Sequence, residues 1–228
     1  MPATKKINGY PFLKYKPQTL SENEQLHNSK VFSEFLMKRR SVRYFSTKPV
    51  AEGIIQNILS AANSAPSGAN KQPWKFYAIS NVELKTKIRI AAEQEEYESY
   101  HGRMPQKWLD DLAPFQTDWK KPFLETAPWL IVVFKESYEK GKNGKKINNY
   151  YVTESVGIAT GFLIAAIHFA GLVTLTHTPS PMNFLSKLLN SPENEKPFLL
   201  LPVGYPAEEC WVPDIKNKTT DEVSGFYL

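Results

Sequence analysis

The sequence contains one cysteine, Cys210, which excludes an intramolecular disulfide and a multi-cysteine metal site. Its four histidines, His27, His101, His168 and His177, are scattered without H-E-x-x-H or similar ligand spacing, so we expect no metal centre. The glycine-rich fingerprint of nicotinamide-dinucleotide binding is also missing. The scarcity of cysteine predicts a reducing compartment.

A secretory leader is not apparent, because residues 1–28 lack an apolar stretch and a small-residue cleavage site. We expect them to form an N-terminal arm of a soluble, cytoplasmic protein. One apolar run, residues 155–175, has about the length that spans a bilayer. His168 in its middle, Gly171 as a stop signal and the β-branched residues that follow favour a buried core helix and then a strand over a membrane helix.

The excess of positive charge is small, with a net charge of +5 and a pI near 9.1. This charge gives a mild attraction for anions, well short of a basic tail that binds nucleic acid. The chain has 228 residues, of which 42% are hydrophobic, and it contains no internal repeat or low-complexity linker. We therefore expect a single domain with its own apolar core.

Apolar periodicity predicts alternating helices and strands. Helices are expected over residues 28–40, 51–66, 81–100, 148–171 and 182–190. Strands are expected over residues 42–45, 73–80, 129–136, 172–178 and 197–206. Strands separated by helices predict an α+β fold, an α/β sandwich with a central sheet flanked by helices. Glycine and prolines break the chain into a hinged excursion at about residues 93–123, and residues 205–228 read as an extended tail.

Three arginines, Arg39, Arg40 and Arg43, surround Ser41 at the start of the strand expected at residues 42–45. Cations in this place are compatible with the solvated end of a helix, where they interact with its dipole. Guanidinium groups also bind phosphate oxygens bidentately, and the Ser41 hydroxyl would add a donor. A nucleic-acid surface would need a wider basic stripe with stacking aromatics, and this sequence shows none.

A second motif, APSGANKQPW, follows at residues 65–74. Pro66, Ser67 and Gly68 predict a turn whose small residues let the backbone approach a ligand, although an ordinary helix-to-strand turn has the same composition. RRSVR followed by APSG and QPW resembles the nitroreductase-like flavoprotein superfamily. The resemblance implies a nitroreductase-like fold with a central mixed β-sheet, which forms an intertwined homodimer with FMN at the subunit interface.

The resemblance also implies a set of flavin contacts. The cofactor-binding residues that it implies are Arg39, Arg40, Ser41, Arg43, Pro66, Ser67, Gly68, Thr176, His177, Thr178, Lys216 and Lys218. The Thr178 hydroxyl would hydrogen-bond to flavin N5 and favour one-electron steps. Lys216 and Lys218 would supply phosphate-binding charge where the animal members carry an arginine, without its bidentate fork.

The segment from Glu95 to Lys135 resembles the substrate lid of the iodotyrosine deiodinase family, and the match extends over about residues 29–218. In this family a glutamate, a tyrosine and a lysine bind the amino-acid end of the substrate, and motif alignment places them at Glu96, Tyr100 and Lys121. The backbone N–H of Ala69 would stabilise the substrate phenolate. The implied reaction is FMN-dependent reductive dehalogenation of halotyrosines, 3-iodo-L-tyrosine giving L-tyrosine and iodide, with NAD(P)H or a reductase as electron source.

The residues themselves give weaker but independent support for a substrate clamp formed by Glu96, Tyr100 and Lys121. Glu96 and Tyr100 are four apart and share one face of a helix, whereas Lys121 comes from the far side of the broken excursion. A zwitterionic amino acid needs an anion for its ammonium and a cation for its carboxylate, which Glu96 and Lys121 would supply. Alternatively, the charged residues at 93–99 would form a solvent-exposed face of the helix.

Two other functions are compatible with the sequence. A broad-specificity FMN nitroreductase or quinone reductase would share the fold without the clamp. A non-catalytic anion or RNA binder would use only the arginines, and its affinity would fall steeply with salt. We favour the halotyrosine dehalogenase over both of these, and we expect no nucleic-acid or membrane partner. We also expect the N-terminal arm and the tail after Tyr205 to embrace a second subunit.

Overall fold

A computed structural model of the chain describes residues 3–227, which divide after Lys38 into two compact units. In the first unit, strands β1 (Thr4–Ile7) and β2 (Tyr10–Leu13) pair antiparallel. Asn8 and Gly9, with φ of 48° and 86°, form the turn between them, as expected for an Asn-Gly hairpin. The sequence reading did not predict this hairpin.

Helix α1 (Glu22–Met37) completes the first unit and starts six residues before the predicted helix at 28–40. A capping box fixes its start, because the Ser21 hydroxyl accepts the Glu24 N–H and the Glu24 carboxylate accepts the Ser21 N–H at 2.8 Å. No side chain of α1 is buried within the described part of the chain.

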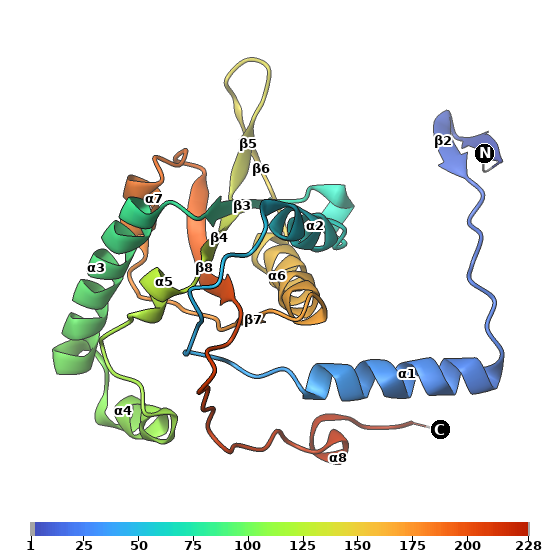
Figure 1. Ribbon diagram of the computed structural model, residues 1–228. Helices are drawn as coiled ribbons and strands as arrows, with labels where there is room; N and C mark the ends of the chain where they lie inside the picture. Colours follow the sequence, from blue (N-terminus) through green and yellow to red (C-terminus); the bar gives the residue numbers. More distant parts are fainter. Residues whose placement is uncertain (1–2, 228) are drawn as a thin grey trace. The chain divides into compact units, whose positions relative to one another are not determined.

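The second unit is built on a four-stranded sheet with the order β3-β4-β8-β7 (Figure 1). The strands are β3 (Trp74–Ile79), β4 (Trp129–Glu136), β7 (Val173–Thr174) and β8 (Glu195–Gly204). All three neighbouring pairs are antiparallel, and parallel pairing among the described residues is confined to an isolated bridge between Ser41 and Thr174.

Helices cover both faces of this sheet. On one face α2 (Glu52–Asn63) and α6 (Val152–Phe169) pack over Ile131, Val133 and Leu201. On the other, α3 (Val82–Glu98), α5 (Phe123–Thr126) and α7 (Asn183–Leu188) pack over Val132, Phe134 and Leu200. Successive residues of β4 thus serve opposite cores, as the period-two geometry of a strand requires. The predicted α+β sandwich is confirmed.

Helix α6 is long and apolar enough by composition to cross a membrane, with a mean hydropathy of 1.5. Its buried residues Val156, Ala159 and Leu163 pack into the core against α2 and the sheet, so the core-helix prediction is confirmed. Its opposite side exposes Ile158 and Phe162.

Four shorter regions lie outside these layers. The excursion after α3 consists of a π-helical turn η2 (Ser99–Arg103), α4 (Gln106–Leu112) and a 3-10 turn η3 (Ala113–Phe115) before α5. Strands β5 (Tyr138–Lys140) and β6 (Lys146–Asn148) form a hairpin around a lysine-rich turn at residues 141–145. The tail contains a single helical turn, α8 (Thr220–Val223), and another 3-10 turn, η1 (Gly68–Asn70), precedes β3.

Of the predicted strands, one does not form and one is shorter than expected. Residues 42–45 form no strand, because only isolated bridges from Ser41 to Thr174 and from Phe45 to Pro206 hold this segment to its neighbours. Burial of Val42 and Phe45 accounts for its β-like composition. The strand expected at 172–178 reduces to β7 and a bridge from His177 to Leu200.

Candidate functional site

A cavity of about 610 Å³ lies between the excursion and the segment that follows β7. Its lining residues are Arg43, Glu96, Ser99, Tyr100, Arg103, Met104, Trp108, Leu112, Thr117, Lys121, Phe123, Leu175, Thr176, His177, Thr178, Ser180 and Pro181. Seven predicted site residues therefore meet around one space, although the sequence brings them from four separate stretches.

The end of α3 and the π-helical turn after it place two of these residues. Asn81 caps α3, its side chain accepting the Leu84 N–H at 2.8 Å, and the helix then presents Glu96 in its last turn. The helix widens at η2, where the Met104 N–H bonds to the Ser99 carbonyl at 2.9 Å. Such π-turns are often found at functional sites.

The far part of the excursion folds back onto this helix. The Tyr100 hydroxyl donates to the Thr117 carbonyl at 3.2 Å, and Lys121 Nζ lies 5.4 Å from the centre of the Tyr100 ring. Lys121 Nζ is 3.4 Å from Glu96 Oε2 and also contacts Thr117 Oγ1 at 3.3 Å and the Asp118 carbonyl. The structure thus brings Glu96, Tyr100 and Lys121 together.

The Glu96–Lys121 pair is almost fully buried from solvent, with side chains 10% and 5% exposed. Burial raises the pKa of the Glu96 carboxyl, and the attraction of Lys121 opposes this shift. Burial likewise lowers the pKa of the Lys121 ammonium against the attraction of Glu96. Buried charges are costly unless each has a partner, so a ligand that separates Glu96 from Lys121 must offer an opposite charge to each of them.

His177 lies beside Glu96 in the wall of the cavity. Its backbone exchanges hydrogen bonds with Leu200 at 2.9 and 3.0 Å, which buries the imidazole while Thr176 and Thr178 remain exposed. Burial, followed by the repulsion of Lys121 and Arg43, lowers the pKa of His177 to about 3. The imidazole is therefore neutral, with Nδ1 3.9 Å from Glu96 Oε1.

The arginine motif is divided between two places. Arg43 lines the cavity and lies 5.9 Å from the centre of the Phe115 ring. Arg40 donates to the Pro213 carbonyl, which brings the tail segment before Lys216 and Lys218 beside the motif. The described residues that line the cavity include neither these two lysines nor Arg39, Arg40 and Ser41.

The loop from Pro66 to Ala69 also lies outside the cavity lining of the described chain. It follows α2, and Gly68 donates to the Ser155 hydroxyl of α6 at 3.4 Å. An added Cβ at Gly68 would lie 3.0 Å from the Tyr151 ring, so this close approach favours glycine. Ala69 adopts φ 46° and ψ 31°, a strained conformation for alanine. This loop is therefore on the α2–α6 face of the sheet, opposite to the clamp.

Sequence reasoning missed several residues that shape the cavity. Arg103 lines it and pairs with Glu95 at 2.7 Å and with Glu98, which ties η2 back to α3. Thr117 contacts both Tyr100 and Lys121. Residues eight apart, such as Glu95 and Arg103, are not neighbours that helix spacing predicts. Their ion pair therefore becomes visible only when the π-helical turn η2 is known.

Comparison with known proteins gives a consistent result. The Nitroreductase family model matches residues 36–205. An iodotyrosine deiodinase of Haliscomenobacter hydrossis is 56% identical over 216 residues, which cover 95% of this chain and 97% of the relative. Iodotyrosine deiodinase 1 of Homo sapiens is 45% identical over 203 residues, covering 89% of this chain and 70% of the relative.

A solved structure is similar over most of its length. The crystal structure of oxidized iodotyrosine deiodinase bound to FMN and 3-iodo-L-tyrosine has a TM-score of 0.72 and 31% identity, covering 86% of this chain and 100% of the other. A nitroreductase-like protein from Streptococcus mutans, with a TM-score of 0.64 and 18% identity, shares the fold.

Proposed function

Since this chain belongs to the nitroreductase family, and its similar curated relatives are iodotyrosine deiodinases, we propose that it is an FMN-dependent iodotyrosine deiodinase. The reaction replaces iodine on the ring of 3-iodo-L-tyrosine with hydrogen, consuming two electrons and one proton and releasing L-tyrosine and iodide. FMN supplies the two electrons when it is bound.

The observation that carries this proposal is the buried Glu96–Lys121 pair at 3.4 Å in the cavity wall. An α-amino acid zwitterion separates the pair without leaving either charge unpaired, because its ammonium binds Glu96 and its carboxylate binds Lys121. Tyr100, already stacked beside Lys121, adds a hydroxyl and an aromatic surface. A neutral nitroaromatic offers neither charge, so this site favours an amino-acid substrate over a generic one.

The residues around the cavity fit a flavin mononucleotide. Thr176 and Thr178 are exposed beside the cavity, where their hydroxyls are available to the isoalloxazine edge, and Thr178 would donate to N5. The guanidinium of Arg43 would bind the polar edge of the flavin. The phosphate would take the remaining cations and donors, namely Arg39, Arg40, Ser41, Lys216 and Lys218.

We also place the cofactor between two subunits of a homodimer. Pro66, Ser67, Gly68 and Ala69 belong to the α2–α6 face, whereas the clamp belongs to the α3–α5 face, and one protomer keeps the two sets apart. A second copy would bring its own loop to the flavin, with the Ala69 N–H at the phenolate. The exposed Ile158 and Phe162 of α6 support such an interface.

The electron source is NAD(P)H or a separate reductase, acting through the flavin. We expect a cytoplasmic location, which the single, unpaired Cys210 supports.

The test is a titration of FMN-loaded protein with 3-iodo-L-tyrosine, followed by flavin fluorescence, with a nitroaromatic as comparison. We expect saturable quenching by iodotyrosine, lost in Glu96→Gln, together with dithionite-driven release of iodide by the wild type. Binding of the nitroaromatic alone would instead indicate a nitroreductase. Absence of flavin, with salt-sensitive anion binding, would indicate a non-catalytic binder.

A further inference from the structure

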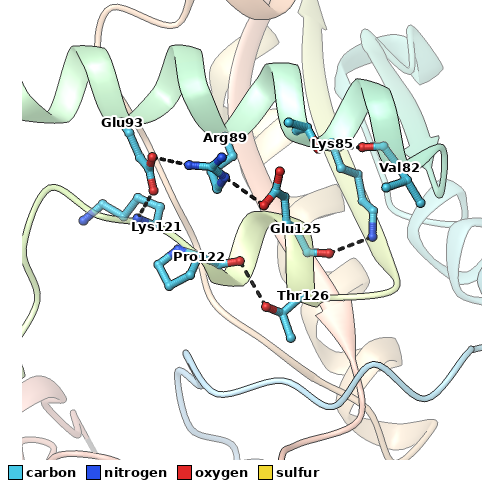
Figure 2. A network of polar contacts seen from close by, with 9 residues as sticks. Val82, Lys85, Arg89, Glu93, Lys121, Pro122, Glu125 and Thr126 are labelled. Atoms are coloured by element: carbon cyan, nitrogen blue, oxygen red, sulfur yellow. Dashed lines mark hydrogen bonds and ion pairs between the residues drawn. The ribbon is translucent and has the colours of Figure 1, made fainter.

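One face of α3 carries a row of charged residues that continues into the clamp. Lys85, Arg89, Glu93 and Glu96 are spaced by four, four and three residues, so they lie along one side of the helix. The first three contact residues 121–127, the segment that begins with Lys121 and contains α5 (Figure 2). The same helix face therefore presents one half of the clamp and holds the backbone of the other.

The first two contacts fix α5 against α3. Lys85 Nζ donates to the carbonyls of Glu125 at 3.0 Å and Ala127 at 2.7 Å. Arg89 Nε lies 3.0 Å from Glu125 Oε2, and Arg89 also donates to Glu93 Oε2 at 2.5 Å. Arg89 thus joins carboxylates from the two helices.

Glu93 makes the contact closest to the site. Its Oε1 accepts the backbone N–H of Lys121 at 2.7 Å, while its Oε2 is held by Arg89 (Figure 2). The Glu93 side chain is only 14% exposed, so water cannot readily replace either bond. Glu96, one helical turn further on, faces the Lys121 ammonium at 3.4 Å.

We propose that Glu93 is a positioning residue for substrate recognition, which fixes the backbone of Lys121 so that its ammonium faces Glu96 and the substrate carboxylate. This inference rests on the proposed function, in which Lys121 binds the amino-acid end of the substrate. The side chain of lysine is long and flexible, so a mobile backbone at Lys121 would spread the position of its ammonium still further. Arg89 contributes by orienting Glu93, and neither residue touches substrate or flavin.

The test compares Glu93→Ala and the isosteric Glu93→Gln with wild type, using FMN-loaded full-length protein and two probes. 3-Iodo-L-tyrosine carries the zwitterion, and 2-iodophenol lacks it. We expect the KM for iodotyrosine to rise about tenfold in Glu93→Ala and less in Glu93→Gln, with kcat and the kinetics of iodophenol little changed. Glu83→Ala, an exposed carboxylate on the same helix, is the matched control.

A double-mutant cycle separates positioning from general damage to the fold. In a Lys121→Ala background no ammonium remains to be placed, so adding Glu93→Ala should leave the KM for iodotyrosine unchanged. Hydrogen exchange of the Lys121 amide in the cofactor-free protein gives a readout without activity, and Glu93→Ala should speed it markedly.

The outcomes are distinguishable. A wild type that does not prefer iodotyrosine to iodophenol would overturn the proposed function and this inference with it. A wild type with that preference, but with an unchanged KM in both Glu93 variants, would overturn this inference alone. Equal losses on both probes, or additive effects in the cycle, would also overturn it. If Glu93→Ala does not fold, Glu93→Gln decides by the same criteria.

Discussion

The buried imidazole of His177 makes the folded state sensitive to acid. Its pKa is about 3 in the folded protein against an ordinary 6.5, so between these values the unfolded chain binds more protons. The contribution of the neutral His177 to the free energy of unfolding is therefore fully present above pH 6.5. It falls as the pH is lowered toward 3, by at most about 1.4 kcal/mol per pH unit. Glu96 acts in the opposite direction, because burial raises its pKa.

We expect His177→Gln to flatten this dependence in urea unfolding curves measured between pH 7 and 4. The variant removes the imidazole titration and leaves Glu96, Lys121 and Arg43, the ionisable groups around it, in place. His27→Gln, an exposed histidine of α1, should retain the wild-type curve. Parallel curves for wild type and His177→Gln would contradict a neutral buried imidazole.

Within the excursion, two tryptophans whose roles the sequence leaves open occupy different environments. Trp108 of α4 lines the cavity and is 54% exposed, so it is available to cover a bound aromatic ring. Trp119 is half-buried and packs edge-on against Tyr97 at 5.4 Å, which anchors the excursion to α3.

We therefore expect opposite effects when each tryptophan is replaced by alanine. Trp108→Ala should raise the KM for iodotyrosine several-fold, because it removes stacking surface worth about 1 kcal/mol, and should leave trypsin resistance unchanged. Trp119→Ala should speed tryptic cleavage at Lys107 or Lys120 by loosening the excursion. Identical behaviour of the two variants in both assays would contradict this division of roles.

Secondary structure was predictable wherever one local signal decided it. The Asn81 cap, the apolar run of β4 and the periodicity of α2 place their elements within a few residues. The sequence also holds two local signals for the first unit: Asn8-Gly9 marks the hairpin, and Ser21-x-x-Glu24 marks the start of α1. Residues 42–45 misled because their β-like composition reflects burial at a sheet edge without a continuous ladder.

The sequence suggests residues for the candidate site but not their arrangement. Spacing puts Glu96 and Tyr100 on one face, and the family resemblance supplies Lys121. Neither shows that Glu93 holds the Lys121 backbone, because that bond joins residues 28 apart in the chain. Nor does spacing show that the Pro66–Ala69 loop and the clamp lie on opposite faces of the sheet, since only strand order and helix placement decide this.

For the whole molecule, the separation of the Pro66–Ala69 loop from the clamp is the strongest argument for a functional homodimer. Helix α6 exposes Ile158 and Phe162, four residues apart on one side. Beyond the adjacent backbone of α6, an added Cβ at the neighbouring Gly157 or Gly161 would meet no atom of residues 3–227 within 4 Å. A smooth apolar helix face of this kind suits contact with a second copy.

We expect Phe162→Glu to convert the proposed homodimer to a monomer in light scattering and to lose bound FMN, because a buried unpaired carboxylate at an interface is strongly unfavourable. Ile90→Glu, at an exposed apolar position on α3, should remain dimeric and yellow. A Phe162→Glu monomer that keeps its flavin would place the whole cofactor site within one protomer. The loop at Ala69 would then need another role, because in one protomer it belongs to the sheet face opposite the clamp.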